Sequence, residues 1–174
     1  NGTASGQAFT AAAQELNNLI VSNTHADGVT LADSSTVTGT FTDITPSSKL
    51  TFDALSTFAF ANININGQAT GTKITMVSND PANADVPSRQ WYFNVAQASP
   101  QASYINVTDS DANGGNQISA LVGANGGNNE NWIFAATISG TVLTAEDKST
   151  NISAGKTISL SIHVRATTTA EPAA

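Results

Sequence analysis

The feature that most constrains the fold is a strict two-residue alternation of apolar and polar side chains, which is clearest in residues 157–167. Its apolar members are Ile158, Leu160, Ile162 and Val164. This period is typical of a β-strand with one buried side and one solvent-facing side. A turn of small residues, 151–156, precedes the strand, and a Thr/Ala/Pro tail follows it. We therefore expect the chain to end by completing a sheet.

Composition favours an extracellular β protein with a polar, weakly charged surface. Charged residues make up 11% of the chain, against about 25% in typical soluble domains. Ser, Thr, Asn, Gln and Gly must therefore cover the surface. The net charge is −7, and the few basic residues are dispersed, which argues against nucleic acid as a partner. The chain has no cysteine, and no apolar run is long enough to cross a membrane.

The N-terminal part of the chain has the spacing of a helix. In Ala8 to Val21, apolar residues recur at intervals of three and four, and residues 11–13 are all alanine. This pattern predicts an amphipathic helix. We interpret residues 1–27 as an extension whose helix packs on the sheet or against a neighbouring subunit.

From residue 28 onward the period changes to two. Val29, Leu31, Val37 and Phe41 fall on one side of a strand, together with the small residue Gly39. Similar short segments follow up to the final strand and are separated by Gly, Pro and Asn turn signals. No internal repeat and no change in composition is visible. The pattern predicts one antiparallel β-sandwich over residues 28–174.

No catalytic arrangement emerges from the spacing of titratable residues. His25 lies in a turn-like segment, and His163 lies on the polar side of the last strand. The acidic residues Glu130, Glu146 and Asp147 lie in predicted loops. Neither a nucleophile with its base nor a pair of catalytic carboxylates is indicated. We expect a protein that is not an enzyme.

A calcium-like pattern occurs once. Asp109, Asp111 and Asn113 alternate before Gly114, like the first half of an EF-hand loop. The twelfth position is Ala120 where that loop requires glutamate, so an EF-hand is excluded. A looser Ca²⁺ site and a metal-free turn rich in Asp and Asn are the two interpretations. No other cofactor is indicated.

Aromatic residues and sequons offer further sites. Trp91, Tyr92, Tyr104 and Trp132 would suit a platform for a sugar ring, whereas inward-facing tryptophans would belong to the core. Residues 123–131 are almost wholly Gly and Asn, which predicts an exposed, mobile loop. Sequons for N-glycosylation begin at Asn1, Asn106 and Asn151, and they matter only if the source glycosylates secreted proteins.

Two stretches carry a resemblance to a known family. One is Thr36 to Phe60, which contains Ser48-Lys49-Leu50-Thr51-Phe52, and the other is Trp132 to Val164, which contains Ile138-Ser139-Gly140-Thr141 and Ala154-Gly155-Lys156. Together they resemble subunits of bacterial fimbriae assembled by the chaperone-usher route. The similarity is greatest to the cysteine-free kind found in the enteric common pilus and capsule-like antigens.

The resemblance implies a fold, a partner and a location. Each subunit of that family is an incomplete immunoglobulin-like sandwich, completed by a strand from the N-terminal extension of the next subunit. The donor candidate here is residues 28–44, and its buried side is Val29, Leu31, Val37, Gly39 and Phe41. The implied partners are identical subunits and an assembly chaperone. The implied role is a cell-surface filament, or fimbria, that serves adhesion or biofilm formation.

Two alternatives come from other classes of protein. A secreted carbohydrate-binding module would use exposed Trp or Tyr residues, or the Gly/Asn loop. The head of a type IV pilin, without its hydrophobic stem, would account for the predicted N-terminal helix.

Overall fold

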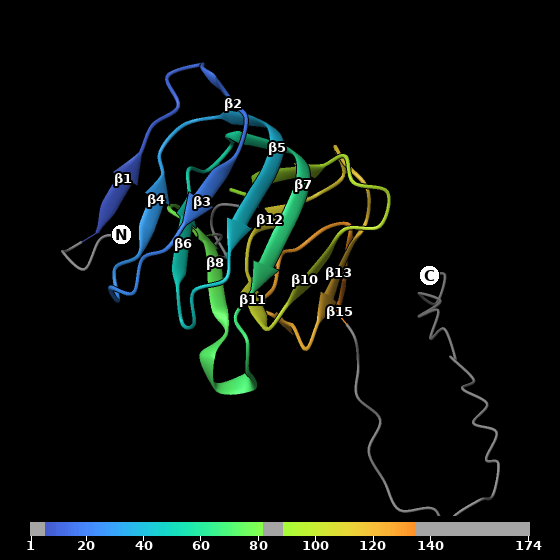
Figure 1. Ribbon diagram of the computed structural model, residues 1–174. Coiled ribbons are helices and arrows are strands. Elements are labelled where there is room, and N and C mark those ends of the chain that lie inside the picture. The colour runs from blue at the N-terminus through green and yellow to red at the C-terminus, as the bar shows by residue number, and fades with distance from the viewer. Residues whose placement is uncertain (1–5, 82–88, 135–174) are drawn as a thin grey trace, which may run out of the picture. The chain divides into compact units, whose positions relative to one another are not determined.

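The computed structural model describes residues 6–81 and 89–134 as a parallel β-solenoid (Figure 1). By its internal contacts the chain divides into residues 1–136 and residues 137–174, and only the first unit is described below. The predicted strand at 157–167, His163, Glu146, Asp147 and the sequons at Asn1 and Asn151 lie outside the described residues.

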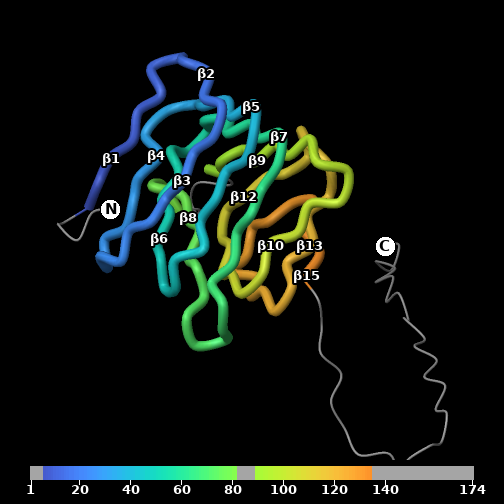
Figure 2. The backbone as a smooth tube through the Cα atoms, viewed as in Figure 1, coloured from blue at the N-terminus to red at the C-terminus, as the bar shows by residue number. Residues whose placement is uncertain are grey.

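The described chain winds through successive coils, each contributing one strand to a six-stranded sheet and one or two strands to a second sheet (Figure 2). The first three coils contain β1 (Gln7–Phe9), β2 (Glu15–Leu16) and β3 (Leu19–Val21), then β4 (Val29–Leu31) and β5 (Ser35–Asp43), then β6 (Lys49–Phe52) and β7 (Thr57–Asn66). A short 3₁₀ turn, η1 (Thr70–Thr72), leads into the fourth coil. The remaining coils contain β8 (Ile74–Ser78), β9 (Trp91–Val95) and β10 (Gln101–Ser103), then β11 (Ile105–Val107), β12 (Ser110–Asp111) and β13 (Ile118–Leu121), then β14 (Ala124–Asn125) and β15 (Trp132–Phe134).

Every pairing between the named strands is parallel. The first sheet has the order β1-β4-β6-β8-β11-β14. In the second sheet, the long strands β5 and β7 each cover two sides of the solenoid. The first half of β7 pairs with β9 and its second half with β10. β5 pairs in the same way with β2 and then β3, and its register against β7 shifts between Val37 and Thr40.

Equivalent positions of successive coils lie directly above one another. One column of the first sheet contains Gln7, Val29, Leu50, Met76, Val107 and Asn125. The sequence intervals between these residues are unequal, and the residues themselves differ. The structural repeat is therefore not visible as a sequence repeat, and the prediction that the chain has no internal repeat missed it.

Aromatic side chains fill the interior between the two sheets. The ring of Phe52 stacks on that of Trp91, with centroids 3.8 Å apart and planes at 3°. Phe58 and Phe93 pack edge-on against Phe52. All four side chains are buried. Stacked and edge-on contacts between aromatic rings add to the free energy gained from apolar burial.

The prediction of an antiparallel, immunoglobulin-like sandwich is wrong. A two-residue period shows which side of a strand is buried, but it does not show in which direction the neighbouring strand runs. An antiparallel sandwich requires that many strands pair with a strand that runs in the opposite direction. In the structure the next strand lies on another side of the same coil, and the pairing partner lies one coil away.

The predicted helix at Ala8 to Val21 is also wrong, because this segment forms the first coil. The Asp33 carboxylate accepts hydrogen bonds from the backbone N–H groups of Ala11 and Ala12, at 2.7 and 2.8 Å. Ala12 and Ala13 adopt positive φ angles of 51° and 62°, which breaks a helix at this point. Hydrogen bonds to the next coil therefore outweigh the helix propensity of the alanines.

Donor-strand exchange is contradicted by the position of the predicted donor. Val29, Leu31, Val37 and Phe41 are buried in the core of their own chain, so residues 28–44 are not held in reserve for a neighbour. Gly39 is indeed crowded, but by the same chain: a Cβ there would lie 2.3 Å from the carbonyl oxygen of Asn17.

Candidate functional site

The first coil is the end of the solenoid within the described residues, and it presents strands with an unpaired edge. Among the described strands, β1 pairs only with β4, and β2 and β3 pair only with β5. The Gln7 N–H donates to Gly28 O at 3.1 Å, and Phe9 O accepts from the Ala32 N–H at 2.9 Å. Because the peptide groups of a strand alternate in direction, those of Ala8 point away from β4. No strand of residues 6–81 or 89–134 pairs with this edge, so within them it can accept another strand.

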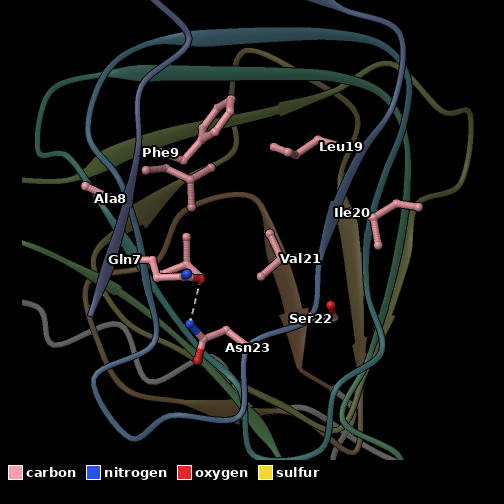
Figure 3. A pocket seen from close by; sticks show the side chains of 10 residues that line it. Gln7, Ala8, Phe9, Leu19, Ile20, Val21, Ser22 and Asn23 are labelled. Carbon is pink, nitrogen blue, oxygen red and sulfur yellow. Dashed lines mark hydrogen bonds between the residues drawn. The ribbon is translucent and has the colours of Figure 1, made fainter. Parts of the chain in front are cut away.

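This open coil exposes part of the apolar interior. A cavity of about 290 Å³ opens between β1, β3 and β4. Figure 3 shows Phe9, Leu19 and Val21 directed into it, whereas Ile20 lies on the outer side of β3. Ile20 is 72% exposed. Each inner coil, by contrast, is paired with a coil on either side.

A hydrogen bond between amide side chains crosses one side of the cavity. Asn23 Nδ2 donates to Gln7 Oε1 at 3.0 Å (Figure 3). The Asn23 side chain is buried, and its Oδ1 accepts from the His25 N–H at 2.7 Å. These bonds fix the turn between β3 and β4 and join it to β1. Hydrogen bonds therefore hold the residues of the open end in a defined arrangement.

The three predicted calcium residues do not converge. Asp109 lies at a corner and is buried, and its Oδ1 accepts from Asn128 Nδ2 at 2.8 Å. Asp111 Oδ1 accepts from the Asn113 N–H at 2.8 Å, and Asn113 Nδ2 donates to Glu130 Oε2 at 2.7 Å. Within residues 6–81 and 89–134, no three His, Asp or Glu side chains gather as metal ligands. Calcium binding stays a prediction.

The Gly/Asn segment 123–131 belongs to the last described coil, where asparagine side chains bind the backbone of the coil before. Asn129 Nδ2 donates to Val107 O at 2.8 Å, and its Oδ1 accepts from the Ser110 N–H at 3.0 Å. Asn131 Nδ2 donates to Ala112 O at 3.0 Å. These asparagines thus replace missing backbone bonds at the corners. The high density of asparagine in residues 123–131 was the sequence feature that could have indicated this role.

The predicted aromatic platform is not assembled. Trp91 is buried, and its indole N–H donates to Thr108 O at 3.0 Å. Trp132 is partly buried and donates to Ser110 Oγ at 3.1 Å. Tyr92 and Tyr104 are also partly buried. The interpretation of Trp91 as a core residue is confirmed.

The helical spacing of residues 8–21 conceals the edge of the first coil, because it predicts a helix where the structure has β1, β2 and β3. His25, the one histidine of the described chain, lies 3.4 Å from Asp27 at the turn beside this end. Comparisons with models of protein families, with curated proteins and with solved structures give no match. In the part of the chain that the structure describes, no helix has the length and apolar character needed to span a bilayer.

Proposed function

We propose that this protein is a structural subunit of an extracellular, cell-surface assembly, and that identical chains join at the open first coil. The observation that carries the proposal is the combination, on one surface, of an unpaired strand edge and an exposed apolar interior. Association at this surface adds a neighbour to an intact solenoid, and no strand leaves its own fold.

Backbone geometry supports the choice of a second copy as the occupant. Two first coils related by a twofold axis would place the β1 edges of the two chains antiparallel to each other, and twofold dimers are the commonest oligomers. The peptide groups of Ala8 in each chain would then find partners. Phe9 and Leu19 of both copies would cover each other's cavity.

Electrostatics predicts how such a contact depends on salt. Glu15 and Asp27 are exposed on the first coil, and no Lys or Arg occurs before Lys49. Two first coils therefore repel each other weakly, and salt screens that repulsion. We expect association to strengthen as the salt concentration rises.

Proline at position 8 tests this proposal. Ala8→Pro removes the outward N–H, and an edge strand tolerates proline where its N–H faces solvent. We expect the unmodified chain to dimerise with rising concentration and Ala8→Pro to stay monomeric, as measured by sedimentation. Ala8→Thr keeps the N–H and serves as the matched control.

Circular dichroism establishes that each variant is folded before its mass is compared. Two results would overturn the proposal: an unmodified chain that is monomeric at every concentration and salt condition, or an Ala8→Pro variant that associates as Ala8→Thr does.

A further inference from the structure

One outer side of the solenoid, here called the neutral face, carries no charged side chain and is mostly polar, with Leu121 as an apolar member. It comprises the outward residues on the second halves of β5 and β7 and on β10 and β13. Its central members are Thr40, Thr42, Asn62, Asn64, Gln101 and Ser119. The whole chain has thirteen acidic and six basic residues, yet none of them lies at these positions.

Parallel pairing arranges these side chains as a regular array. Thr40 lies beside Asn62, Thr42 beside Asn64, and Gln101 beside Ser119. Neighbouring strands are about 4.8 Å apart, and successive outward residues of one strand about 6.6 Å apart. Hydroxyl and amide groups therefore repeat in two directions across the face.

The amides of this face have no structural role in the described part of the chain. There, the side chains of Asn62, Asn64 and Gln101 make no hydrogen bond, unlike those of Asn129 and Asn131. Asparagine is unfavourable in strands. β7 thus carries two exposed asparagines, Asn62 and Asn64, in outward positions. No hydrogen bond within the described residues compensates for their low strand propensity.

We propose that the neutral face binds a neutral polysaccharide. A primary amide offers both a donor and an acceptor to sugar hydroxyls. Ile20 lies beside Thr42, and Ile133 lies beside Ser119. They are 72% and 48% exposed, and they can pack against the apolar faces of sugar rings. A polymer lying across the strands would meet Thr42, Asn64, Gln101 and Ser119 on the inner coils, between the two isoleucines.

The absence of charged side chains from the neutral face indicates that the polysaccharide is itself uncharged. An anionic polymer would need Lys or Arg at the contact, and a cationic polymer would need Asp or Glu. Binding through neutral hydrogen bonds is insensitive to salt, because no counterions are exchanged. This inference does not depend on association at the first coil.

Affinity electrophoresis in gels that contain dextran, mannan, xyloglucan or β-glucan tests the proposal, together with pull-down on cellulose and chitin. Alginate serves as the anionic comparison. We expect at least one neutral glycan to retard or capture the full chain, equally at low and high salt, and alginate to have no effect. Failure of every neutral glycan would overturn the proposal, and so would binding that high salt abolishes.

A double variant and a control variant test whether glycan binds on the neutral face. Asn62→Val with Asn64→Val removes both amides and raises strand propensity, so the fold is retained. We expect about tenfold weaker glycan binding, which corresponds to about 1.4 kcal/mol. Asn106→Val on β11 of the other sheet is the matched control. Equal losses in both would overturn the proposal.

A change in oligomer size in the double variant, without a change in glycan retardation, would assign the face to a second copy and overturn the proposal as well. The same gels run with Ala8→Pro separate the two proposals, because that variant keeps its neutral face whether or not the chain dimerises.

Discussion

Asp43 is a buried carboxyl among the apolar side chains at one corner of the second coil. Its column contains Val21 and Ile65 on the neighbouring coils. Ser48 Oγ donates to its Oδ2 at 2.6 Å, and the Thr45 N–H donates to its Oδ1 at 2.9 Å. Burial raises the pKa of Asp43 above its ordinary value of 3.8, against the lowering effect of these hydrogen bonds.

The raised pKa predicts a pH dependence of stability. Because the folded-state pKa is the higher one, the protonated Asp43 stabilises the fold below the ordinary pKa, and this contribution is lost as the pH rises through the folded-state value. Relative to Asp43→Asn, the free energy of unfolding should therefore fall as the pH rises from below 3.8 through the raised pKa of Asp43. Urea titrations of both chains measure this difference. A difference that rises with pH would contradict the prediction.

Individual strands show how much the sequence could predict. Alternation correctly predicted that Val29, Leu31, Val37 and Phe41 share one side, which is buried. It could not predict the pairing partners, because strand direction depends on the path of the connections. The asparagines of β7 alternate with Ile63 and Ile65, so their outward position was readable, but their place in a neutral array was not.

The stacked pair of β6 and β9 is the element whose loss should cost most. Trp91→Ala removes the ring that stacks on Phe52 and leaves a cavity, and we expect it to destabilise the fold by about 3–5 kcal/mol. Tyr92→Ala, at the partly exposed next position, should cost much less. Denaturation followed by far-ultraviolet circular dichroism compares the two. Similar losses would mean that the stack contributes little beyond its neighbours.

At the scale of the whole described unit, the solenoid is nearly one-dimensional, since each coil contacts mainly the coils beside it. The first coil has a neighbour on one side alone among the described residues. Sequence reasoning could not find this architecture, because the coils differ in length and residue type. The architecture depends on the alignment of equivalent positions in successive coils, such as Val29, Leu50 and Met76.

Hydrogen exchange should reveal a gradient of local stability, in which the first coil opens more easily than the inner coils. We expect the amides of β1 and β3 to exchange faster than those of β7, which is paired on both sides. Raising the protein concentration should slow exchange in β1 and leave β7 unchanged if two first coils associate. Uniform protection from β1 to β7 at low concentration would contradict the gradient.

The unequal corners bear on how such a chain can change over time. The path from β7 to β8 uses residues 67–73, whereas the path from β10 to β11 uses Tyr104 alone. Nevertheless, Asn66 still pairs with Ser103, and Ile74 with Ile105. Insertions at a corner therefore leave the stacked interior untouched. A lineage can lengthen, shorten or exchange these corners to vary what it displays, and an engineer can graft peptides there, without redesigning the core.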